Sequence, residues 1–143
     1  MGYAVAKSLG KMPVVAGVCD GFIGNRILAA LREAADTTLM DGSTPAEIDR
    51  AMVAFGYAMG PYETQDLSGL DIAHANRRRL DSSRDPSHRY IPIADCLVTQ
   101  NRLGKKNGAG WYNYPNGSIT VDPKVEDIIC REAKAANIKR RHF

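Results

Sequence analysis

The chain has 143 residues, of which 44% are hydrophobic and 24% charged, with a formal net charge of +3 at pH 7. This ordinary globular composition excludes a disordered or fibrous protein, and the length suits one domain with a single core. The small charge, with acidic residues interspersed among basic ones, argues against a nucleic-acid partner, and no segment approaches the roughly 20 apolar residues of a membrane span.

The first elements expected along the chain are a short helix and a strand. Residues 3–9 have helical character, Gly10-Lys11-Met12-Pro13 breaks it, and the β-branched run at residues 14–18 favours a strand. A lone strand cannot satisfy its own backbone hydrogen bonds. We therefore expect this strand to add to a sheet supplied by another domain.

A long helix is predicted next. Asp20 is the expected N-cap, apolar residues then recur at helical spacing to about residue 40, and Asp41-Gly42 ends the helix. Asn25 would lie about one turn into it, where strand gives way to helix, and sites in open α/β sheets favour that place. The alternative is that Asn25 merely faces water.

Further helices are expected over most of the remaining chain. Thr44-Pro45-Ala46-Glu47 combines a capping box with proline at the first helical position, so a helix should run to Gly56. Gly60-Pro61 begins another helical segment, Ser68-Gly69 interrupts it, and a further helix follows. Residues 81–88 have the composition of a loop.

The C-terminal third is predicted to contain two more helices and an irregular segment between them. Residues 91–100 are amphipathic, and the segment from Gly104 to Gly117 is rich in glycine and aromatic residues that should pin it to the helices. Asp122-Pro123 then caps a final helix. A basic run, residues 139–142, follows it.

Few side chains have a pattern typical of a reactive site. Cys19, Cys96 and Cys130 are widely spaced in apolar stretches, which predicts buried free thiols in a reducing compartment. His74 is expected on a helix flank, His88 in a loop and His142 in the tail. No spacing of histidine and cysteine supports a metal site, and no nucleophile is paired with a base.

Three motifs occur in the order and approximate spacing of one family. They are Gly21-Phe22-Ile23-Gly24-Asn25-Arg26, the run from Gly60 to Asp71 (GPYETQDLSGLD), and the run from Arg102 to Tyr114 (RLGKKNGAGWYNY). From about residue 4 to 125, the chain resembles the C-terminal domain of 3-hydroxyacyl-CoA dehydrogenases. The resemblance implies a mainly α fold, like the C-terminal domain of 6-phosphogluconate dehydrogenase, with a short N-terminal helix-strand remnant.

The resemblance also implies a domain layout and a site. Residues 1–19 would be the end of a nucleotide-binding domain, residues 20–137 the helical domain, and residues 138–143 a basic tail. Asn25 matches the family's active-site asparagine, so it is the one expected catalytic and substrate-binding residue. An amide suits this role because it donates and accepts hydrogen bonds without adding charge.

Other parts of the family's machinery are missing from the sequence. The full-length enzymes bind NAD through a GxGxxG fold and use a His-Glu pair, and neither is present. The glycines at 104, 108 and 110 neither follow a strand nor open a helix, so they fail the test for a dinucleotide fingerprint. We expect no cofactor-binding or metal-binding residue here.

Three functions follow as hypotheses. The leading one is the substrate-side and assembly domain of an NAD-dependent 3-hydroxyacyl-CoA dehydrogenase of fatty-acid β-oxidation, inactive alone. The second is a structural dimerisation module, with Phe55, Tyr57, Met59 and Tyr62 on the paired face or equally in the core. The third is an acyl-CoA-binding module, in which basic residues near Arg77 or Lys105-Lys106 meet phosphates; solvated charges are the alternative.

The expected partners and location follow from the same resemblance. Acyl-CoA is the substrate in the full enzyme, and the chain would form a homodimer or pack against a nucleotide-binding domain. Residues 138–141 resemble the segment that leads into a second helical copy in multifunctional enzymes, so that copy is another candidate partner. The protein should be soluble and cytoplasmic, or peroxisomal or mitochondrial in a eukaryote.

Overall fold

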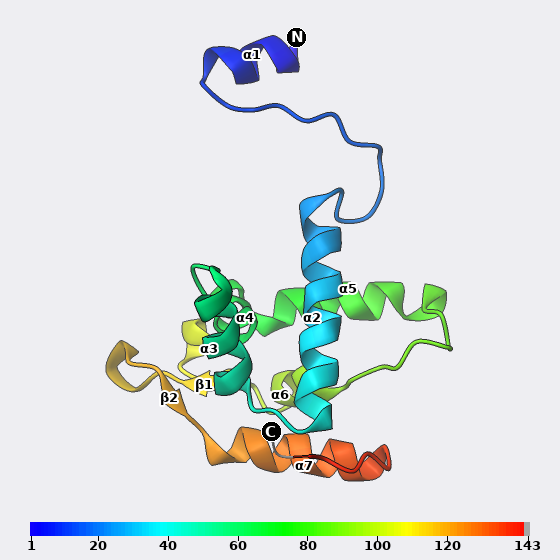
Figure 1. The fold of residues 1–143 in the computed structure, drawn as a ribbon, viewed down its shortest axis with the longest axis vertical. Coiled ribbons are helices and arrows are strands. Elements are labelled where there is room, and N and C mark those ends of the chain that lie inside the picture. Colours follow the sequence, from blue (N-terminus) through cyan, green and yellow to red (C-terminus); the bar gives the residue numbers. More distant parts are fainter. Residues whose placement is uncertain (142–143) are drawn as a thin grey trace. The chain divides into compact units, whose positions relative to one another are not determined.

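The chain is mainly helical and divides into two compact units. A computed structural model describes residues 1–141 and assigns Met1–Leu31 to the first unit and the residues from Arg32 onward to the second (Figure 1). His142 and the last residues of the predicted basic tail lie outside the described residues. The unit boundary lies within a helix, and the domain limits at residues 19/20 and 137/138 stay predictions.

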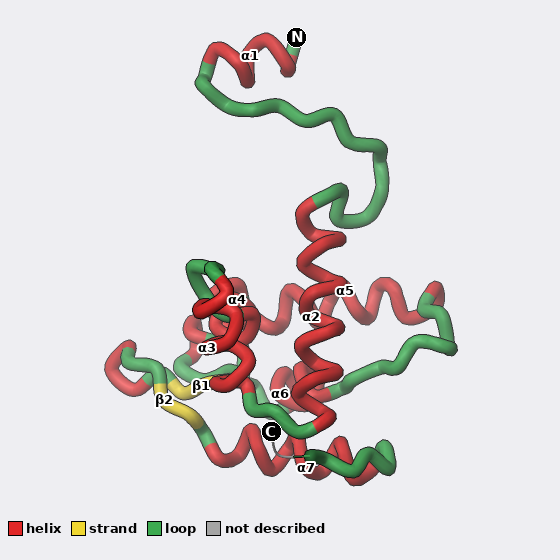
Figure 2. The backbone as a smooth tube through the Cα atoms, in the orientation of Figure 1, coloured by secondary structure: helices red, strands yellow, loops and turns green. Residues whose placement is uncertain are grey.

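The first unit holds one short helix, a long connection and the start of a second helix. Helix α1 spans Gly2–Ser8, as predicted, and α2 spans Gly24–Asp41. The predicted strand at residues 14–18 is wrong, because these residues lie in a segment without helix or strand (Figure 2). A strand needs a partner for its backbone groups, and nothing in this unit pairs with it.

The second unit contains the remaining helices and a small hairpin. The helices are α3 (Pro45–Phe55), α4 (Pro61–Ser68), α5 (Leu70–Leu80), α6 (Ile93–Thr99) and α7 (Pro123–Ala135), with short 3₁₀ turns at Asp81–Ser83, Lys105–Asn107 and Pro115–Gly117. Strands β1 (Tyr112–Asn113) and β2 (Thr120–Val121) pair antiparallel. The predicted helices and the break at Ser68-Gly69 are therefore confirmed.

Local sequence signals account for several helix ends. The Thr44 side chain accepts a hydrogen bond from the Glu47 backbone N–H at 3.3 Å, and Glu47 accepts one from the Thr44 N–H at 2.8 Å. This reciprocal pair is the predicted capping box, and Pro45 occupies the first helical position. Asp122 caps α7 in a similar way, through the Lys124 backbone N–H at 3.0 Å.

The core lies in the second unit and joins its helices to the aromatic segment. Its buried residues come from every helix of this unit and from β1: Ala35, Leu39, Met40, Ile48, Tyr62, Leu70, Ile93, Ala94, Leu97, Trp111, Tyr112, Tyr114, Val125, Ile128, Ile129 and Ala133. The Trp111 and Tyr62 rings meet with centroids 4.5 Å apart. The aromatic segment is thus packed on the helices, as predicted.

The chain after α7 turns back and is bound to the α2–α3 connection. The Arg141 backbone N–H donates to the Asp41 carbonyl at 2.7 Å, and Arg140 Nη2 donates to the carbonyls of Gly42 and Ser43 at 3.1 Å each. A Cβ on Gly42 would lie 1.6 Å from the Arg141 carbonyl oxygen. Glycine at this position therefore permits the close contact.

The cysteines are more exposed than the sequence predicts. Cys19 and Cys130 are exposed and Cys96 is partly buried, so the expectation of three buried thiols is wrong. Cys19 lies in the connection before α2, and Cys130 lies on a face of α7 that the core does not cover. Over residues 1–141, none of the helices has the length and hydropathy needed to cross a membrane.

Candidate functional site

Asn25 is the second residue of α2, and its side chain is exposed. Its backbone N–H donates to the Gly21 carbonyl at 3.1 Å. Within the described part of the chain, the Asn25 amide group makes no hydrogen bond, so it can both donate to and accept from a bound molecule. The structure therefore presents Asn25 as an available polar group at the start of a helix.

The turn before α2 fixes the entry of the chain into this helix. Gly21 and Phe22 both have a positive φ, 73° and 47°, and the Phe22 N–H donates to the Cys19 carbonyl at 3.2 Å. The helix therefore begins at Gly24, and the prediction that Asp20 is its N-cap is wrong. A Cβ on Gly21 would lie 3.0 Å from the Asn25 Cβ, so this glycine leaves room for Asn25.

Arg26 folds back on the same turn. Its Nη1 lies 3.8 Å from the Cys19 sulfur, which in turn lies 3.8 Å from the Phe22 carbonyl oxygen. These contacts are internal to the first unit. They give Arg26 a local structural role beside the exposed Asn25.

The second motif begins at a helix cap made by a distant carboxylate. Asp49 of α3 accepts hydrogen bonds from the backbone N–H groups of Tyr62 at 2.8 Å and Glu63 at 3.0 Å. The Tyr112 hydroxyl also donates to Asp49, at 2.7 Å. Asp49 thus satisfies free N–H groups at the start of α4 and joins that helix to the aromatic segment.

The third motif is organised by a second buried carboxylate, that of Asp66. Trp111 donates its backbone N–H to Oδ1 at 2.8 Å, and Oδ2 accepts the Tyr112 N–H at 3.0 Å and the Tyr114 hydroxyl at 2.9 Å. Asp66 is fully buried. Burial raises the pKa of both carboxyls, Asp49 and Asp66, while their hydrogen bonds act in the opposite direction.

Arg102 completes this buried polar network. Its Nε donates to the Gly110 carbonyl at 2.9 Å and its Nη1 to Asp122 Oδ2 at 2.7 Å, so it links the aromatic segment to the start of α7. No local sequence pattern indicates these partners of Arg102. The second and third motifs therefore hold the fold together and do not form a reactive cluster.

Gly60→Ala should destabilise the chain through Asp49. An alanine Cβ would lie 2.2 Å from the Asp49 Cγ, so the carboxylate would have to leave its position at the α4 N-terminus. We expect the free energy of unfolding to fall by about 1–3 kcal/mol, measured by denaturant titration. Gly17→Ala, which meets no atom within 4 Å, is the control, and equal losses for both variants would contradict this account.

The glycines of the third motif do not form a nucleotide site. A Cβ on Gly104 would lie 2.3 Å from the Asp66 carbonyl oxygen, and one on Gly110 would lie 1.9 Å from Asp66 Oδ1. The space that these glycines leave is filled by Asp66. The residues that the structure describes in this segment therefore do not fit a dinucleotide.

A polar cluster between α5 and α6 surrounds Asp95. The Asp95 carboxylate accepts from His74 Nδ1 at 2.9 Å, from Arg77 Nε at 2.9 Å, and from the Tyr90 hydroxyl. The Arg84 guanidinium stacks over the Tyr90 ring, with Cζ 3.7 Å from the ring centroid. This cluster places His74 on a helix flank, as predicted, and ties the connection after α5 to α6.

Asp36 lies near the same cluster, and the pKa of its carboxyl is strongly shifted. Burial raises its pKa to about 7, opposed by the Tyr62 hydroxyl at 3.2 Å and by the charges of Arg77 and Arg32; Asp95 adds to the rise. The folded chain therefore binds a proton at Asp36 more tightly than the unfolded chain does.

This shift predicts a specific pH dependence of stability. Because the folded pKa is raised, Asp36 contributes stability below its unfolded pKa, near 4, and this contribution is lost as the pH rises through about 7. Thermal unfolding of wild type and Asp36→Asn between pH 4 and 8 would measure it. The difference between the two proteins should move in favour of the variant as pH rises, and a constant difference would refute the assignment.

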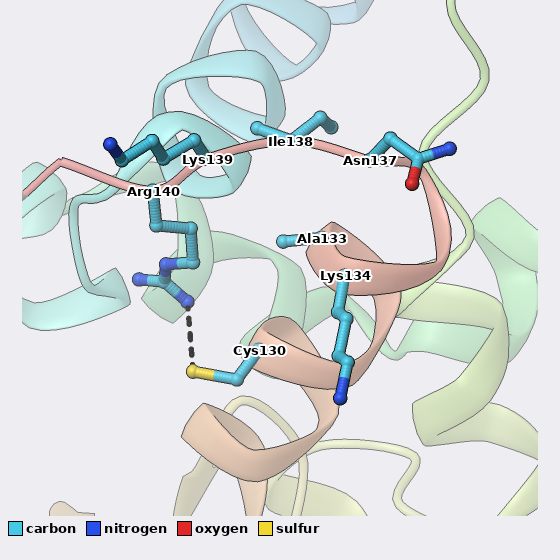
Figure 3. Close-up of a pocket in the computed structure, with 7 residues that line it drawn as sticks. All are labelled: Cys130, Ala133, Lys134, Asn137, Ile138, Lys139 and Arg140. Atoms are coloured by element: carbon cyan, nitrogen blue, oxygen red, sulfur yellow. Dashed lines mark hydrogen bonds between the residues drawn. The ribbon is translucent and has the colours of Figure 1, made fainter.

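One open pocket lies between α7 and the chain that follows it (Figure 3). Its volume is about 370 Å³, and it is lined by Cys130, Ala133, Lys134, Asn137, Ile138, Lys139 and Arg140. Arg140 Nη1 lies 3.5 Å from the Cys130 sulfur. Partial desolvation and the Glu126 carboxylate raise the pKa of the Cys130 thiol against the opposing charge of Arg140, so this group stays protonated at neutral pH and is a poor nucleophile.

Two of the basic residues considered for phosphate binding are held by acidic neighbours. Lys106 Nζ pairs with Asp71 Oδ1 at 2.5 Å, and Arg77 Nη2 pairs with Asp95 Oδ1 at 2.5 Å. Within residues 1–141, no cluster of histidine, cysteine and acidic residues has the geometry to hold a metal ion. Asn25 therefore remains the candidate for contact with a substrate.

The fold is a helical domain in which the first motif presents the exposed side chain of Asn25, and buried residues of the other two motifs, such as Asp66 and Arg102, hold the fold together. Residues 21–114 match the family profile described as "3-hydroxyacyl-CoA dehydrogenase, C-terminal domain". The chain belongs to this family, as its three motifs predicted.

Relatives and solved structures agree with this assignment. The chain is 37% identical to a peroxisomal bifunctional enzyme of Cavia porcellus and 35% identical to that of Homo sapiens, covering 96% of this chain and 21% of each relative. It therefore spans about a fifth of these proteins. A peroxisomal fatty acid beta-oxidation multifunctional protein of Oryza sativa is 34% identical over 87% of this chain and 17% of that protein.

Two of the similar solved structures are of dehydrogenases. The structure of (S)-3-hydroxybutyryl-CoA dehydrogenase from Ralstonia eutropha matches 79% of this chain and 41% of that chain, with a TM-score of 0.69 and 33% identity. The dehydrogenase part of a multifunctional enzyme from C. elegans matches 99% of this chain and 32% of that chain, with a TM-score of 0.67 and 28% identity.

Proposed function

We propose that this chain is the substrate-side and assembly domain of an NAD-dependent 3-hydroxyacyl-CoA dehydrogenase of fatty-acid β-oxidation. In the complete enzyme, a 3-hydroxyacyl-CoA is oxidised to the 3-ketoacyl-CoA. The names of the relatives and the family membership support this reaction class.

The observation that carries the proposal is that the Asn25 side chain, at the start of α2, is exposed and has no hydrogen-bond partner among the described residues. By contrast, Asp66 and Arg102 of the other two motifs are buried and hydrogen-bonded within the chain. Asn25 is thus free to bind a group outside this chain.

The proposed role of Asn25 is to position the substrate and a base supplied by another domain. Its Nδ2 donates and its Oδ1 accepts, so one amide can hold a substrate oxygen and orient an imidazole. NAD, bound by the nucleotide-binding domain of the complete enzyme, would accept the hydride. This chain holds and orients the substrate and carries out no redox step itself.

The proposal predicts that the isolated chain is inactive. Purified chain mixed with acetoacetyl-CoA and NADH should leave the NADH absorbance unchanged, because no described residues offer a dinucleotide site. Circular dichroism of the same sample would show that the chain is folded. Measurable NADH oxidation that depends on acetoacetyl-CoA would overturn the proposal.

A second candidate function, dimerisation, is favoured by exposed apolar residues at the end of α3. Phe55 is 83% exposed and stacks on Tyr57 with ring centroids 6.3 Å apart. Tyr62, which the sequence left open as a contact residue, is fully buried in the core. Sedimentation should show a dimer that Phe55→Ser weakens, and a monomer at every concentration would count against this function.

A further inference from the structure

Two asparagines of the chain, Asn107 and Asn116, are each followed by glycine. In such a pair the glycine nitrogen can attack the asparagine side chain, because glycine has no side chain to obstruct the approach. Asn107-Gly108 and Asn116-Gly117 are both exposed, and both asparagines lie in 3₁₀ turns. Exposure and sequence therefore do not distinguish them.

The hydrogen bonds of the two side chains do distinguish them. The Asn107 Oδ1 accepts from the Leu103 backbone N–H at 3.1 Å, and its Nδ2 donates to the Asn101 carbonyl at 2.5 Å. Both ends of this amide are thus held by backbone groups. Rotation of the Asn107 side chain toward the Gly108 nitrogen requires both bonds to break.

The Asn116 side chain has no such restraint. Among the described residues it forms no hydrogen bond, and it lies in the turn that joins β1 to β2. Its backbone is left-handed, with φ 53° and ψ 28°, and Gly117 follows with φ 83°. The glycine N–H groups do not separate the two sites, because Gly117 donates to Tyr114 at 3.2 Å and Gly108 to Lys105 at 3.3 Å.

We propose that Asn116-Gly117 is a site of spontaneous deamidation and isoaspartate formation, and that the fold protects Asn107-Gly108. The deprotonated Gly117 nitrogen attacks the Asn116 Cγ, a C–N bond forms, and the Cγ–Nδ2 bond breaks with release of ammonia. Water then opens the five-membered imide at either carbonyl, giving aspartate or isoaspartate. The net change is an amide and water converted to a carboxylic acid and ammonia, with no oxidation.

The modification would alter the hairpin. It adds one negative charge, and isoaspartate also places an extra carbon in the main chain of the turn. The two strands pair only through Tyr112 with Val121 and Asn113 with Thr120. A longer turn should therefore weaken this short pairing, beside the segment that carries Tyr112 and Tyr114 into the core.

The test is to age the folded chain at neutral pH and locate the product. Chymotrypsin cleaves between the two sites, after Trp111 and Tyr112, so mass spectrometry can measure each asparagine separately. We expect Asn107 to react about tenfold more slowly than Asn116, the factor that follows from breaking its restraining hydrogen bonds. Ammonia release should match the extent of modification, and Asn116→Gln should remove the dominant product.

A denatured sample separates the effect of the fold from that of the sequence. In guanidinium chloride at the same pH, the two asparagines should react at similar rates, because the hydrogen bonds of Asn107 are lost. Equal rates in the folded chain would overturn the proposal. So would an unmodified Asn116 over a period in which a Tyr-Pro-Asn-Gly-Ser peptide deamidates.

Discussion

Asp66→Asn should lower the free energy of unfolding by about 2–4 kcal/mol. The Asp66 carboxylate accepts hydrogen bonds on both oxygens, from the Trp111 N–H on one side and from the Tyr112 N–H and Tyr114 hydroxyl on the other. An asparagine can accept on one side only. Its NH₂ group would face a buried donor, and that clash leaves polar groups unsatisfied away from water.

Denaturant unfolding followed by Trp111 fluorescence would measure this loss directly, because Trp111 lies at the site and is buried. Asp71→Asn is the matched control, since the Asp71 side chain lies at the surface and forms an ion pair with Lys106. Its unfolding midpoint should stay close to that of the wild type. Similar losses for the two variants would show that Asp66 does not organise the aromatic segment.

Asn25→Ala should lower the rate of the reconstituted dehydrogenase by about 100-fold, the low end of the contribution of a positioned acid–base system. The methyl group cannot hold the substrate or orient a base. Because Asn25 is exposed and makes no hydrogen bond with a described residue, the variant should keep the wild-type unfolding midpoint.

The control for this prediction is Asn76→Ala, which removes an exposed asparagine from α5, outside the three motifs. Steady-state kinetics should show full activity for Asn76→Ala and a loss mainly in kcat for Asn25→Ala. Asn25→Asp tests the importance of the amide itself, because aspartate keeps the shape of the side chain but is charged and cannot donate a hydrogen bond. Full activity of Asn25→Ala would exclude the proposed role.

Local signals predicted the helical parts of the fold well. The capping box at Thr44, the proline at 45 and the glycine at 69 act on neighbouring residues, so their effects can be read from the sequence. The prediction of a strand at residues 14–18 was wrong because strand formation depends on residues elsewhere. β-branched residues favour extended backbone, but a strand forms only when another segment satisfies its hydrogen bonds.

The contacts that hold the motifs together could not be predicted in this way. Asp49 and Tyr112 are far apart in the chain, and so are Asp66 and Trp111, and nothing in their local patterns pairs them. Neither carboxylate has a local sequence pattern that marks it as buried. Gly60 and Gly110 were the sequence features that could have indicated these contacts, since Gly60 leaves space for the Asp49 carboxylate and Gly110 for that of Asp66.

The candidate site was predictable in position but not in detail. The sequence predicted Asn25 about one turn into a helix and just after a strand, whereas the structure has it as the second residue of α2, after a segment without a strand. The left-handed backbone of Gly21 and Phe22 displaced the helix start from Asp20, and helical spacing does not report such a turn. What Asn25 contacts in a complete enzyme depends on groups outside this chain.

The measurement that tests the central claim most directly is NADH oxidation by acetoacetyl-CoA in a mixture of this chain and a separately expressed nucleotide-binding domain from a full-length relative. Each component is also assayed alone. We predict activity only in the mixture, rising with the concentration of either component until the other is saturated. A nucleotide-binding domain that is equally active without this chain would contradict the proposed substrate-side role.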